Sequence, residues 1–572
     1  MRNTGAKRMG VKMKSKVFSI FLTLSVALFG ANTFAVQADE RPLTFAEAVA
    51  RYGGESTQMW GLGLTEDFAE PSPSALWALS QAGTKTITTY CSNITDDPCQ
   101  GAVDLYQVLH LDKCEESSQL SCIADFWAVD PSGKKINGEF VRPILFESKQ
   151  ATKENLDLNI PASSSIYGLW RVPGVLNSSG TDTYLVGTHV TMFRARNEAK
   201  FTYGEINSGI FTSKEVSGNY GLTTVSKAGI SGTGPSRTPE GQDCIALEIG
   251  KCHVTANFPE GYRFGMTLRV GEKLNGWYHG RLSLPSIEVK SWKKGEEIAI
   301  EAEPVKVPSV DFVVPITELS ESQQKEIRDC VLGNCGSKGN IKGVLQTGGN
   351  LAGPQTMNLL MALATAFKDR ATNTTTAWAF RNMFNHGGSI DSGKIARCTQ
   401  KDEGLNGLVF TNALTYSSGP PAFDDKTGSL VYKVASPHFE ANGGVASGTY
   451  DLTMRSNIAR CLYDFSSAAI KAEVSITGSD GENRVATTLV NERDGWLYLS
   501  AKGFTFSAPT IRVKLTQDKK SDQVQPQTDS KQAVASPAVK PTVKRSITCV
   551  KGKVTKKVSG VSPKCPTGFK RK

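Results

Sequence analysis

The chain has 572 residues, with 54 glycines, 12 cysteines and a formal net charge of +10. Six of the positive charges lie in residues 1–38 and nine lie in residues 545–572, which leaves residues 39–544 with a net charge of −5. The basic character therefore belongs to the two ends of the chain, and this excludes a body that binds nucleic acid through general positive charge. The length suffices for about three or four domains with cores of their own.

Residues 1–38 have the pattern of a secretory signal peptide. Cationic positions up to Lys16 precede an apolar stretch, residues 17–30, that is too short to cross a bilayer. Val36 and Ala38 are small residues at the positions that a signal peptidase reads, so we expect cleavage before Asp39. An uncleaved anchor helix is the alternative. Because no later apolar run is long enough to span a membrane, we expect an exported chain, extracellular or associated with the cell wall, without a transmembrane span.

The cysteine spacing predicts a set of mostly local disulfides. An even number of cysteines fits an oxidising compartment. Short loops separate most neighbouring cysteines, which leaves one long-range pair, and the absence of a Cys-x2-Cys pair argues against zinc. The predicted pairs are Cys91–Cys99, Cys114–Cys122, Cys244–Cys252, Cys330–Cys335, Cys398–Cys461 and Cys549–Cys565.

Short runs rich in Val, Ile, Thr, Tyr and Phe, separated by turn signals, favour β structure over most of the body. Hairpin turns are predicted where Asp and Gly supply unusual φ values. The predicted strands include residues 86–90, 184–188, 268–270 and 511–515, and the predicted turns are residues 130–133, 425–428 and 478–481. We therefore expect a mainly β fold with a helical insert, in β-sandwich-like domains stabilised by local disulfides.

Helices are predicted in two places. Residues 43–52 read as a helix, with Thr44 and Glu47 spaced as a capping box. In the insert, Ser320 and Gln323 can cap a helix that runs to Cys330. A second helix, residues 354–367, is apolar on nearly every face, so we expect it to be buried in the core.

The predicted order of segments combines these signals. Residues 516–544 contain no aromatic residue and are dominated by Gln, Ser, Lys, Asp and Pro, which predicts a flexible linker. The expected segments are a signal peptide (1–38), a partly helical lead (39–83), a β-rich domain with short disulfide loops (84–314), a helical insert (315–400), a second β-sandwich-like domain (401–515), the linker (516–544) and a basic disulfide module (545–572).

Two stretches of the body resemble each other. Each begins with a Gly-Trp pair after Asn or Asp, at Trp277 and Trp496, and ends in a strand with alternating charge, residues 284–290 and 508–514. This echo predicts a repeated β unit. A common hairpin turn followed by an aromatic residue is the alternative.

Motifs that carry chemistry are weak in this sequence. Residues 388–394 match most of a phosphate-binding loop, but Ile395 stands where the motif needs a hydroxyl, so a Gly/Ser turn is the better interpretation. His279 follows the first Gly-Trp turn, and a structural role is favoured over a site. The eight tryptophans could stack on sugars but more often fill cores. We predict no catalytic residue, no cofactor and no metal site.

The C-terminal module is the strongest functional signal. Its valines alternate with lysines as in a small two-stranded unit, and a unit of this size needs the Cys549–Cys565 disulfide because it cannot build a core. Its positive charge suits an anionic polymer of the cell envelope, although a merely solubilising end is the alternative. The candidate polyanion-binding residues are Lys551, Lys553, Lys556, Lys557, Lys564, Lys570, Arg571 and Lys572.

Residues 547–553 and 563–570, with their two cysteines, resemble a short C-terminal module shared by many secreted actinobacterial proteins. Residues 434–438, 459–463 and 494–515 resemble an uncharacterised group of exported surface proteins from the same bacteria. The likeness covers most of residues 84–515 in style and is specific mainly in the last 140 residues. Because that group has no assigned activity, the resemblance implies a compartment and no catalytic residues.

The leading hypothesis is a secreted, non-enzymatic surface protein that the basic module holds to anionic wall polymers. The alternative is an extracellular carbohydrate-binding protein or glycoside hydrolase that recognises glycans. Such a hydrolase needs two acids across a cleft, expected beside tryptophan near Trp277 or the helical insert.

Overall fold

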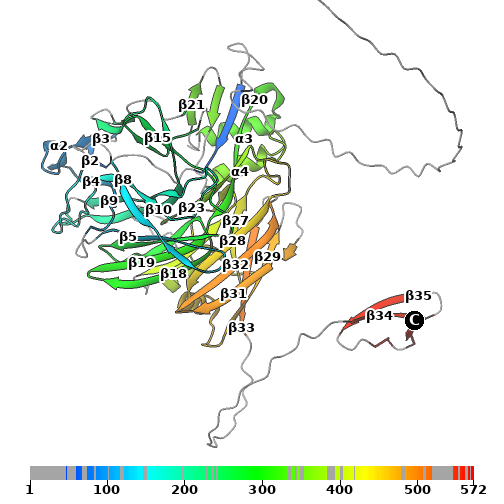
Figure 1. The fold of residues 1–572 in the computed structure, drawn as a ribbon. Helices are drawn as coiled ribbons and strands as arrows, with labels where there is room; N and C mark the ends of the chain where they lie inside the picture. Colours follow the sequence, from blue (N-terminus) through cyan, green and yellow to red (C-terminus); the bar gives the residue numbers. More distant parts are fainter. Residues whose placement is uncertain are drawn as a thin grey trace, which may run out of the picture. The chain divides into compact units, whose positions relative to one another are not determined.

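The computed structural model divides into two compact units, residues 1–518 and residues 519–572, which are described separately as the body and the module (Figure 1). The residues that the structure describes are 47, 59–66, 74–82, 85–100, 102–115, 121–145, 151–195, 197–226, 229–232, 238–239, 242–332, 337–341, 344–347, 353–382, 393–399, 404–417, 419–477, 483–485, 487–506, 510–517, 545–551, 554–560, 564–566 and 568–571. The predicted signal peptide and nearly all of the predicted linker lie outside them.

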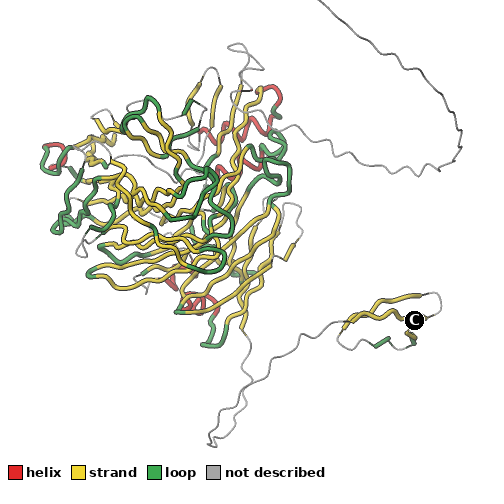
Figure 2. The backbone as a smooth tube through the Cα atoms, viewed as in Figure 1, coloured by secondary structure: helices red, strands yellow, loops and turns green. Residues whose placement is uncertain are grey.

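A 17-stranded sheet forms the centre of the body (Figure 2). Its main path of hydrogen-bonded neighbours runs β3–β2–β4–β9–β10–β23–β17–β24–β28–β32–β31, with β8–β7 branching from β9 and β20–β1–β22–β21 from β23. The strands are β1 (Met59–Leu64), β2 (Ala75–Ala82), β3 (Lys85–Cys91), β4 (Asp104–His110), β7 (Glu139–Leu145), β8 (Ser165–Arg171), β9 (Thr183–Ala195), β10 (Thr202–Thr212), β17 (Gly276–Arg281), β20 (Val305–Pro315), β21 (Ser337–Ile341), β22 (Val344–Thr347), β23 (Asn373–Asn382), β24 (Leu405–Thr411), β28 (Ser447–Arg455), β31 (Thr487–Arg493) and β32 (Trp496–Thr505).

Smaller sheets accompany the large one. A five-stranded sheet has the order β18–β19–β16–β5–β6, and a six-stranded sheet contains β25, β26, β27, β33, β29 and β30. The five-stranded sheet consists of β5 (Cys122–Val129), β6 (Lys135–Asn137), β16 (Arg263–Val270), β18 (Ser283–Trp292) and β19 (Gly295–Glu303). The six-stranded sheet consists of β25 (Thr415–Tyr416), β26 (Ala422–Asp424), β27 (Ser429–Ala435), β29 (Ile470–Thr477), β30 (Asn483–Val485) and β33 (Thr510–Gln517). Two further small sheets are formed by β11 (Lys214–Ser217), β14 (Ala246–Glu248) and β15 (Lys251–Val254), and by β12 (Thr223–Ser226) and β13 (Gly229–Gly232).

The large sheet packs against both of these sheets, which confirms a mainly β fold. On the five-stranded side, Tyr278 and Phe410 share a core with Phe264 of β16. On the six-stranded side, the neighbouring residues Trp277 and Val409 share a core with β27, β29 and β33. Since successive side chains of a strand point to opposite faces, β17 and β24 are buried on both faces.

Strand β33, between β27 and β29 in the six-stranded sheet, shows the simpler pattern of a strand with one buried face. In β33, Ile511, Val513 and Leu515 are buried, while the side chains between them are half-buried or exposed. The strand predicted at residues 511–515 from its run rich in Val and Ile is confirmed. The predicted turns at residues 130–133 and 425–428 also join antiparallel neighbours, β5 with β6 and β26 with β27. The turn predicted at residues 478–481 lies outside the described residues.

Helices are few and short among the described residues: α2 (Asp97–Gln100), the 3-10 helix η2 (Ile316–Glu318), α3 (Glu321–Leu332), α4 (Pro354–Ala362), α5 (Gly393–Thr399) and α6 (Ser456–Tyr463). Ser320 and Gln323 form the predicted capping box, because the Gln323 carboxamide accepts the Ser320 N–H at 3.0 Å and the Ser320 hydroxyl accepts the Gln323 N–H at 3.3 Å. One face of α4 is buried, and its Met357, Leu359 and Leu360 share a core with Trp60 and Phe312. Pro354, Gln355, Asn358 and Met361 are exposed and the helix ends at Ala362, so the prediction of a helix buried on nearly every face and running to residue 367 is confirmed only in part. Of the helix predicted over residues 43–52, only Glu47 is described, and it is helical.

The sequence segments predicted for the body share its central sheet. Residues 39–83 contribute β1 and β2, and residues 315–400 contribute β21, β22 and β23 beside their helices. Neither set of strands was predicted. The domain boundaries within the body therefore stay a sequence prediction, while the described strands from all segments join in one compact unit.

Five of the six predicted disulfides are present: Cys91–Cys99, Cys114–Cys122, Cys244–Cys252, Cys398–Cys461 and Cys549–Cys565. The sixth predicted pair includes Cys335, which lies outside the described residues. The long-range bridge joins α5 to α6, whereas the short bridges hold local turns.

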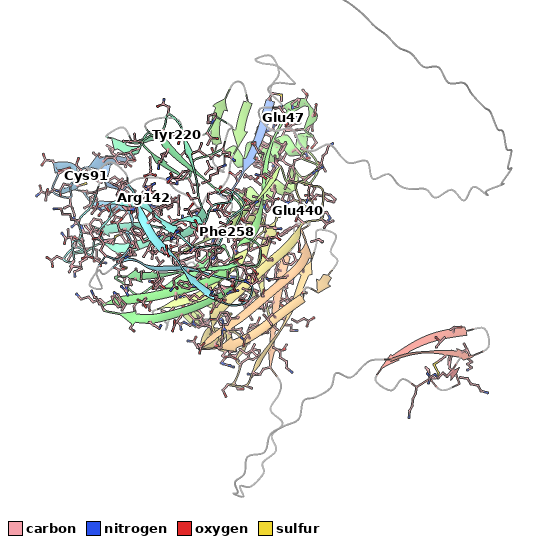
Figure 3. The ribbon with its side chains drawn as sticks, viewed as in Figure 1. Glu47, Cys91, Arg142, Tyr220, Phe258 and Glu440 are labelled. Atoms are coloured by element: carbon pink, nitrogen blue, oxygen red, sulfur yellow. A yellow bond between two sulfur atoms is a disulfide. The ribbon has the colours of Figure 1, made fainter. Side chains whose placement is uncertain are left out.

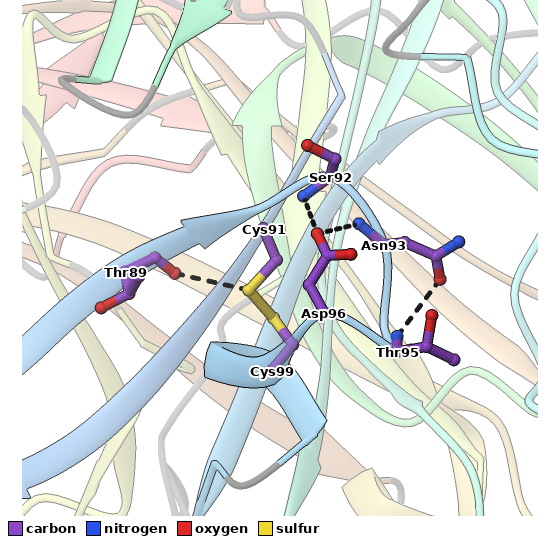
Figure 4. Close-up of a disulfide and its surroundings, with 7 residues drawn as sticks. All are labelled: Thr89, Cys91, Ser92, Asn93, Thr95, Asp96 and Cys99. Carbon is purple, nitrogen blue, oxygen red and sulfur yellow. Dashed lines mark hydrogen bonds between the residues drawn. A yellow bond between two sulfur atoms is a disulfide. The ribbon is translucent and has the colours of Figure 1, made fainter.

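The first bridge shows how such a turn is held (Figure 4). Cys91 ends β3 and Cys99 lies in α2. Between them, the Asp96 carboxylate accepts the backbone N–H groups of Ser92 at 2.8 Å and Asn93 at 2.9 Å. The loop is thus fixed by a covalent bond and by a turn that its own Asp side chain makes.

A row of polar side chains crosses the large sheet. His110 lies opposite His189, Asn207 lies between His189 and Arg381, and Arg381 lies opposite His279 on successive strands. Residues directly opposite each other share a face of the sheet, so these side chains form a continuous row. Burial, with Arg381 nearby, lowers the pKa of His189 to about 4 and places that of His279 well below 6.5, so both imidazoles are neutral at neutral pH.

Arg281 lies two residues beyond His279 on β17, and so on the same face, and its side chain is fully buried. Its guanidinium forms an ion pair with Glu66 and donates to the backbone carbonyls of Thr411 and Leu414, each at 3.0 Å, and of Ala413. It also lies 4.7 Å from the ring of Tyr416. These contacts fasten β17 to the chain that leaves β24.

We expect Arg281→Met to lower the free energy of unfolding of the body by about 3–5 kcal/mol, because it leaves the Glu66 carboxylate buried without its cation. The double variant Arg281→Met, Glu66→Gln should recover part of this loss, since it removes the uncompensated charge. Denaturant unfolding monitored by tryptophan fluorescence checks both.

Arg171→Met is the matched control for this prediction. Arg171 pairs with Glu139 on the surface, where both side chains are at least half exposed, so its variant should leave the unfolding midpoint unchanged. A loss for Arg281→Met no larger than that of the control would contradict the prediction.

Candidate functional site

The module is a small three-stranded sheet closed by a disulfide. β34 (Arg545–Lys551) pairs with β35 (Val554–Gly560), as the valine pattern predicted, and also with β36 (Lys570–Arg571), which was not predicted. Cys549, on the central strand, is buried and bonded to Cys565. The half-buried Phe569, just before β36, is the sequence signal that could have indicated a third strand.

The register distributes the basic residues over both faces of the module. Cys549 lies opposite Arg571, so these two share a face. Val550 lies opposite Lys570 and belongs to the other face. Charge on both faces suits a flexible polymer that can pass around the module.

The predicted polyanion-binding residues differ in how far they are described. The side chains of Lys551, Lys564, Lys570 and Arg571 are exposed. Only the backbone is described for Lys556 and Lys557, both on β35. Lys553 and Lys572 lie outside the described residues.

A second candidate site is a cavity of about 320 Å³ in the body. It lies where β18, β20, β23, β28 and β32 begin or end. Its lining consists of Ser283, Glu303, Pro304, Val305, Lys306, Pro308, Thr374, Asn412, Glu440, Ala446, Ser447, Thr449, Lys502 and Phe506. A cavity of this size falls at the lower end of the range for small-molecule sites, about 300–1,000 Å³.

Asp451 lies beside this cavity and is 1% exposed. On the same face of β28 it neighbours Thr449, and across the ladder it lies opposite Ser500, as Thr449 lies opposite Lys502. Burial raises the pKa of Asp451 to about 6, although the Ser500 hydroxyl, the Leu284 amide and the Lys502 ammonium act in the opposite direction.

The chain at Leu284 turns sharply to reach Asp451. Leu284 has a φ of 49°, in the left-handed region that non-glycine residues rarely adopt. Its N–H donates to Asp451 Oδ1 at 3.1 Å, and its carbonyl accepts from Arg263 at 2.9 Å. This turn lies within β18, at the register shift between Ser283 and Ser286, just after the chain has passed from β17 of the large sheet to β18 of the five-stranded sheet.

Several polar atoms of residues that line this cavity or lie beside it have no hydrogen-bond partner among the described residues. They are the hydroxyls of Ser283, Thr374, Thr449 and Ser500 and the second carboxylate oxygen, Oδ2, of Asp451. Ser283 and Ser500 lie close enough to Asp451 to lower its pKa, but they do not meet hydrogen-bond geometry with it. Unpaired buried polar atoms are uncommon in folded proteins, and each one costs about 1–3 kcal/mol.

Two further places in the body, a cavity and a cluster of charged side chains, are weaker candidates for a binding site. A cavity of about 280 Å³ is lined mainly by hydroxyl and amide side chains and shares Thr374 with the first. Elsewhere, ligand atoms of Glu215, Glu248 and His253 lie within 4.8 Å of one another.

The second of these groups is an ion-pair network. Arg142 contacts both glutamates, at 3.0 Å and 2.5 Å, and Lys251 contacts Glu215 at 2.7 Å. Although burial would raise it, hydrogen bonds from His253 and Arg142 lower the pKa of Glu248 to about 2. Since two cations already neutralise these carboxylates, a metal ion would have to displace them.

The tryptophans lie mostly in the core. Six of the eight are buried: Trp60, Trp127, Trp170, Trp277, Trp378 and Trp496. Neither cavity has a tryptophan in its lining. His279 is buried, with Nδ1 2.7 Å from the Tyr416 hydroxyl. Of the loop-like stretch at residues 388–394, only Gly393 and Lys394 are described, and they begin α5.

No family model matches this chain, and no curated protein matches it. Within the described residues, no helix is long and apolar enough to cross a membrane. The candidate sites therefore rest on the geometry of the chain itself.

We expect Asp451→Asn to raise the free energy of unfolding near neutral pH, by at most about 3 kcal/mol. The folded-state pKa of about 6 lies above the ordinary value of 3.8. Ionisation is therefore easier in the unfolded chain, and the stability that the proton supplies is lost as pH rises through 6. The difference between variant and wild type should be largest at about pH 7.5 and absent at about pH 4. Urea unfolding at both pH values checks this.

Asp130→Asn is the control of opposite sign. A hydrogen bond from the Ser132 hydroxyl, followed by one from the Lys134 amide, lowers the pKa of the exposed Asp130. Its replacement should not stabilise the protein at either pH. An Asp451→Asn variant less stable than wild type near pH 7.5 would show that the buried carboxylate supports the fold.

Proposed function

We propose that this is an exported surface protein of the cell envelope and that its basic C-terminal module holds it to anionic wall polymers. The observation that carries the proposal is the module itself, a separate disulfide-closed unit whose described lysine and arginine side chains are exposed. Its charge contrasts with the net charge of −5 of residues 39–544.

Electrostatics supports this division of roles. A polymer of phosphate or carboxylate groups attracts the module and repels an acidic body, so the body would extend away from the polymer. The disulfides support an oxidising compartment. The signal peptide pattern of residues 1–38 and the resemblance to exported actinobacterial surface proteins complete the proposal.

The proposed role is attachment and display, without catalysis. A carbohydrate-active enzyme was expected to have a cleft lined by tryptophan, whereas the tryptophans among the described residues lie in the core or apart from the two cavities. The alternative function, a body that binds glycans, is supported by a described feature, the cavity beside Asp451.

We expect purified mature protein to bind isolated actinobacterial envelopes at low salt and to be released near 1 M salt, where charges are screened beyond about 3 Å. Removal of residues 545–572 should abolish this binding. Lys551→Ser, Lys570→Ser and Arg571→Ser together should weaken it about tenfold or more, because these charges are exposed. Sedimentation with the envelopes measures the bound fraction.

Two further variants separate charge from fold. Cys549→Ser with Cys565→Ser keeps every charge but removes the bridge, and weaker binding would show that the folded module is required. Arg171→Ser, Lys290→Ser and Lys325→Ser remove three exposed charges from the body and should leave binding unchanged. Equal retention of the full and truncated chains would contradict the anchoring proposal.

A further inference from the structure

A row of four aromatic side chains crosses one end of the large sheet. Strand by strand, it consists of Tyr90 on β3, Trp77 on β2, Tyr106 on β4 and Phe193 on β9. Each residue lies directly opposite the next in the antiparallel register, so all four share one face of the sheet. Cys91, labelled in Figure 3, directly follows Tyr90 on β3 and helps to locate this aromatic row.

The rings of the aromatic row form an unbroken series of contacts. The ring centroids lie 6.2 Å apart for Tyr90 and Trp77, 6.1 Å for Trp77 and Tyr106, and 6.2 Å for Tyr106 and Phe193. The planes of the Trp77 and Tyr106 rings are nearly parallel, at 8°. Four neighbouring strands therefore carry a continuous apolar strip that runs across them.

Core packing does not account for the aromatic row. Leu76, Leu105 and Met192, each next to a residue of the row in sequence, belong to the core on the other face of the sheet. Because successive side chains of a strand point to opposite faces, the row lies on the face turned away from that core. Its four side chains are half-buried, and none of them is part of a hydrophobic core of the described residues. Part of each side chain is therefore accessible to an occupant.

Two polar atoms of the aromatic row are open to solvent. The Trp77 indole N–H and the Tyr90 hydroxyl have no hydrogen-bond partner among the described residues, and neither belongs to their buried unpaired atoms. An indole N–H only donates, whereas a phenol hydroxyl both donates and accepts. An occupant with hydroxyl groups can bond to both.

One carboxylate accompanies the aromatic row. Asp104 lies two residues before Tyr106 on β4, and so on the same face. Burial, and after it the Asp104 carboxylate, raises the pKa of Tyr106, so this carboxylate lies close to the row. On these four strands, Asp104 is the only charged residue of the row or of the two rows beside it, whose other members are Ala75, Leu79, Thr88, Val108, Thr191 and Ala195. A single carboxylate repels a polyanion and accepts hydrogen bonds from neutral hydroxyls.

These features favour a neutral glycan over other polymers. Nucleic acids and other polyanions need positive charge, which these positions do not supply. Proline-rich peptides bind in aromatic-lined grooves, whereas neither of the two described cavities includes a residue of the row. A sugar ring presents C–H groups on its face, which pack on an aromatic ring, and hydroxyls at its edge, which reach polar groups beside that ring.

We propose that the aromatic row binds a linear neutral glycan, whose sugar rings lie on the four aromatic side chains and whose hydroxyls bond to Trp77 Nε1, the Tyr90 hydroxyl and Asp104. The site belongs to the body, so the proposal stands whether or not the module anchors the chain. Because the row crosses four strands, it holds several consecutive sugar units at once, and binding should strengthen with the length of the glycan.

The test is a calorimetric titration of the full mature chain with cellohexaose, chitohexaose and mannohexaose, which are linear and neutral. We expect saturable binding of at least one hexasaccharide, at least about tenfold tighter than that of its disaccharide. The affinity should be the same at about 0.1 M and about 1 M salt, because the ligand carries no charge. Attachment of the module to envelopes is expected to fade over this range, so the two proposals can fail separately.

Variants distinguish the aromatic row from the rest of the body. Trp77→Ala removes one ring together with its N–H and should weaken binding about tenfold or more. Trp292→Ala is the matched control, since Trp292 is also half-buried but lies on β18 of the five-stranded sheet, and it should leave binding unchanged. Asp104→Asn removes the charge at nearly constant size and should weaken binding about tenfold at most.

Controls keep each outcome decisive. Circular dichroism and the unfolding midpoint establish that each variant is folded, and Tyr90→Ala replaces Trp77→Ala if the latter is not. Failure of all three hexasaccharides to bind overturns the proposal. Equal losses of affinity for Trp77→Ala and Trp292→Ala overturn the assignment of the glycan to the aromatic row. Tighter binding of a polyproline peptide than of every hexasaccharide would make the row a peptide-binding surface and would also overturn the proposal.

Discussion

Burial of β17 and β24 on both faces is the constraint on which the rest of the body depends. Trp277 packs toward the six-stranded sheet and its neighbour Tyr278 toward the five-stranded sheet. The same alternation holds for Val409 and Phe410. Two sandwich-like layers therefore share one set of strands, so neither layer can be separated without exposing a core of the other. This explains why the described residues of the body form one compact unit.

Because the layers share strands, the chain has to pass from one sheet to another, and polar contacts stabilise the chain at that passage. At the end of β17 the chain must leave the large sheet and enter the five-stranded sheet, and it does so at Leu282, between two strands. Arg281 holds the end of β17 through Glu66 and backbone carbonyls, and the left-handed Leu284 is held by Asp451 and Arg263. The same crossover places Ser283 at the cavity. The candidate ligand site is thus a product of the layer change, since the sheets cannot close together where the chain passes between them.

The local features of the fold could be predicted from sequence to a large extent. Short cysteine loops, the capping box at Ser320 and the alternation in β33 each depend on residues a few positions apart, and the structure confirms them. Strand β1 could not be predicted, because it pairs with β20 and β22 from distant segments and is buried along its whole length, without alternation. The repeated β unit stays a prediction. Trp277 and Trp496 both lie at the start of strands of the large sheet, but the turn at Gly495 joins β31 to β32 in a hairpin, whereas β17 does not pair with β16.

By itself, the sequence determined the distribution of charge, the disulfide pairs of the described residues, the mainly β character and the small basic module, since these depend on composition and on short spacings. Tertiary structure alone decided that Ser283 and Lys502 meet at one cavity with Asp451 beside them. They come from three strands separated by long stretches of chain, and only the shared sheet and the crossover at Leu282 bring them together. Tertiary structure alone also decided that Arg281 pairs with Glu66. The two residues are far apart in the sequence, and the packing of the layers, which no local sequence pattern shows, brings them together.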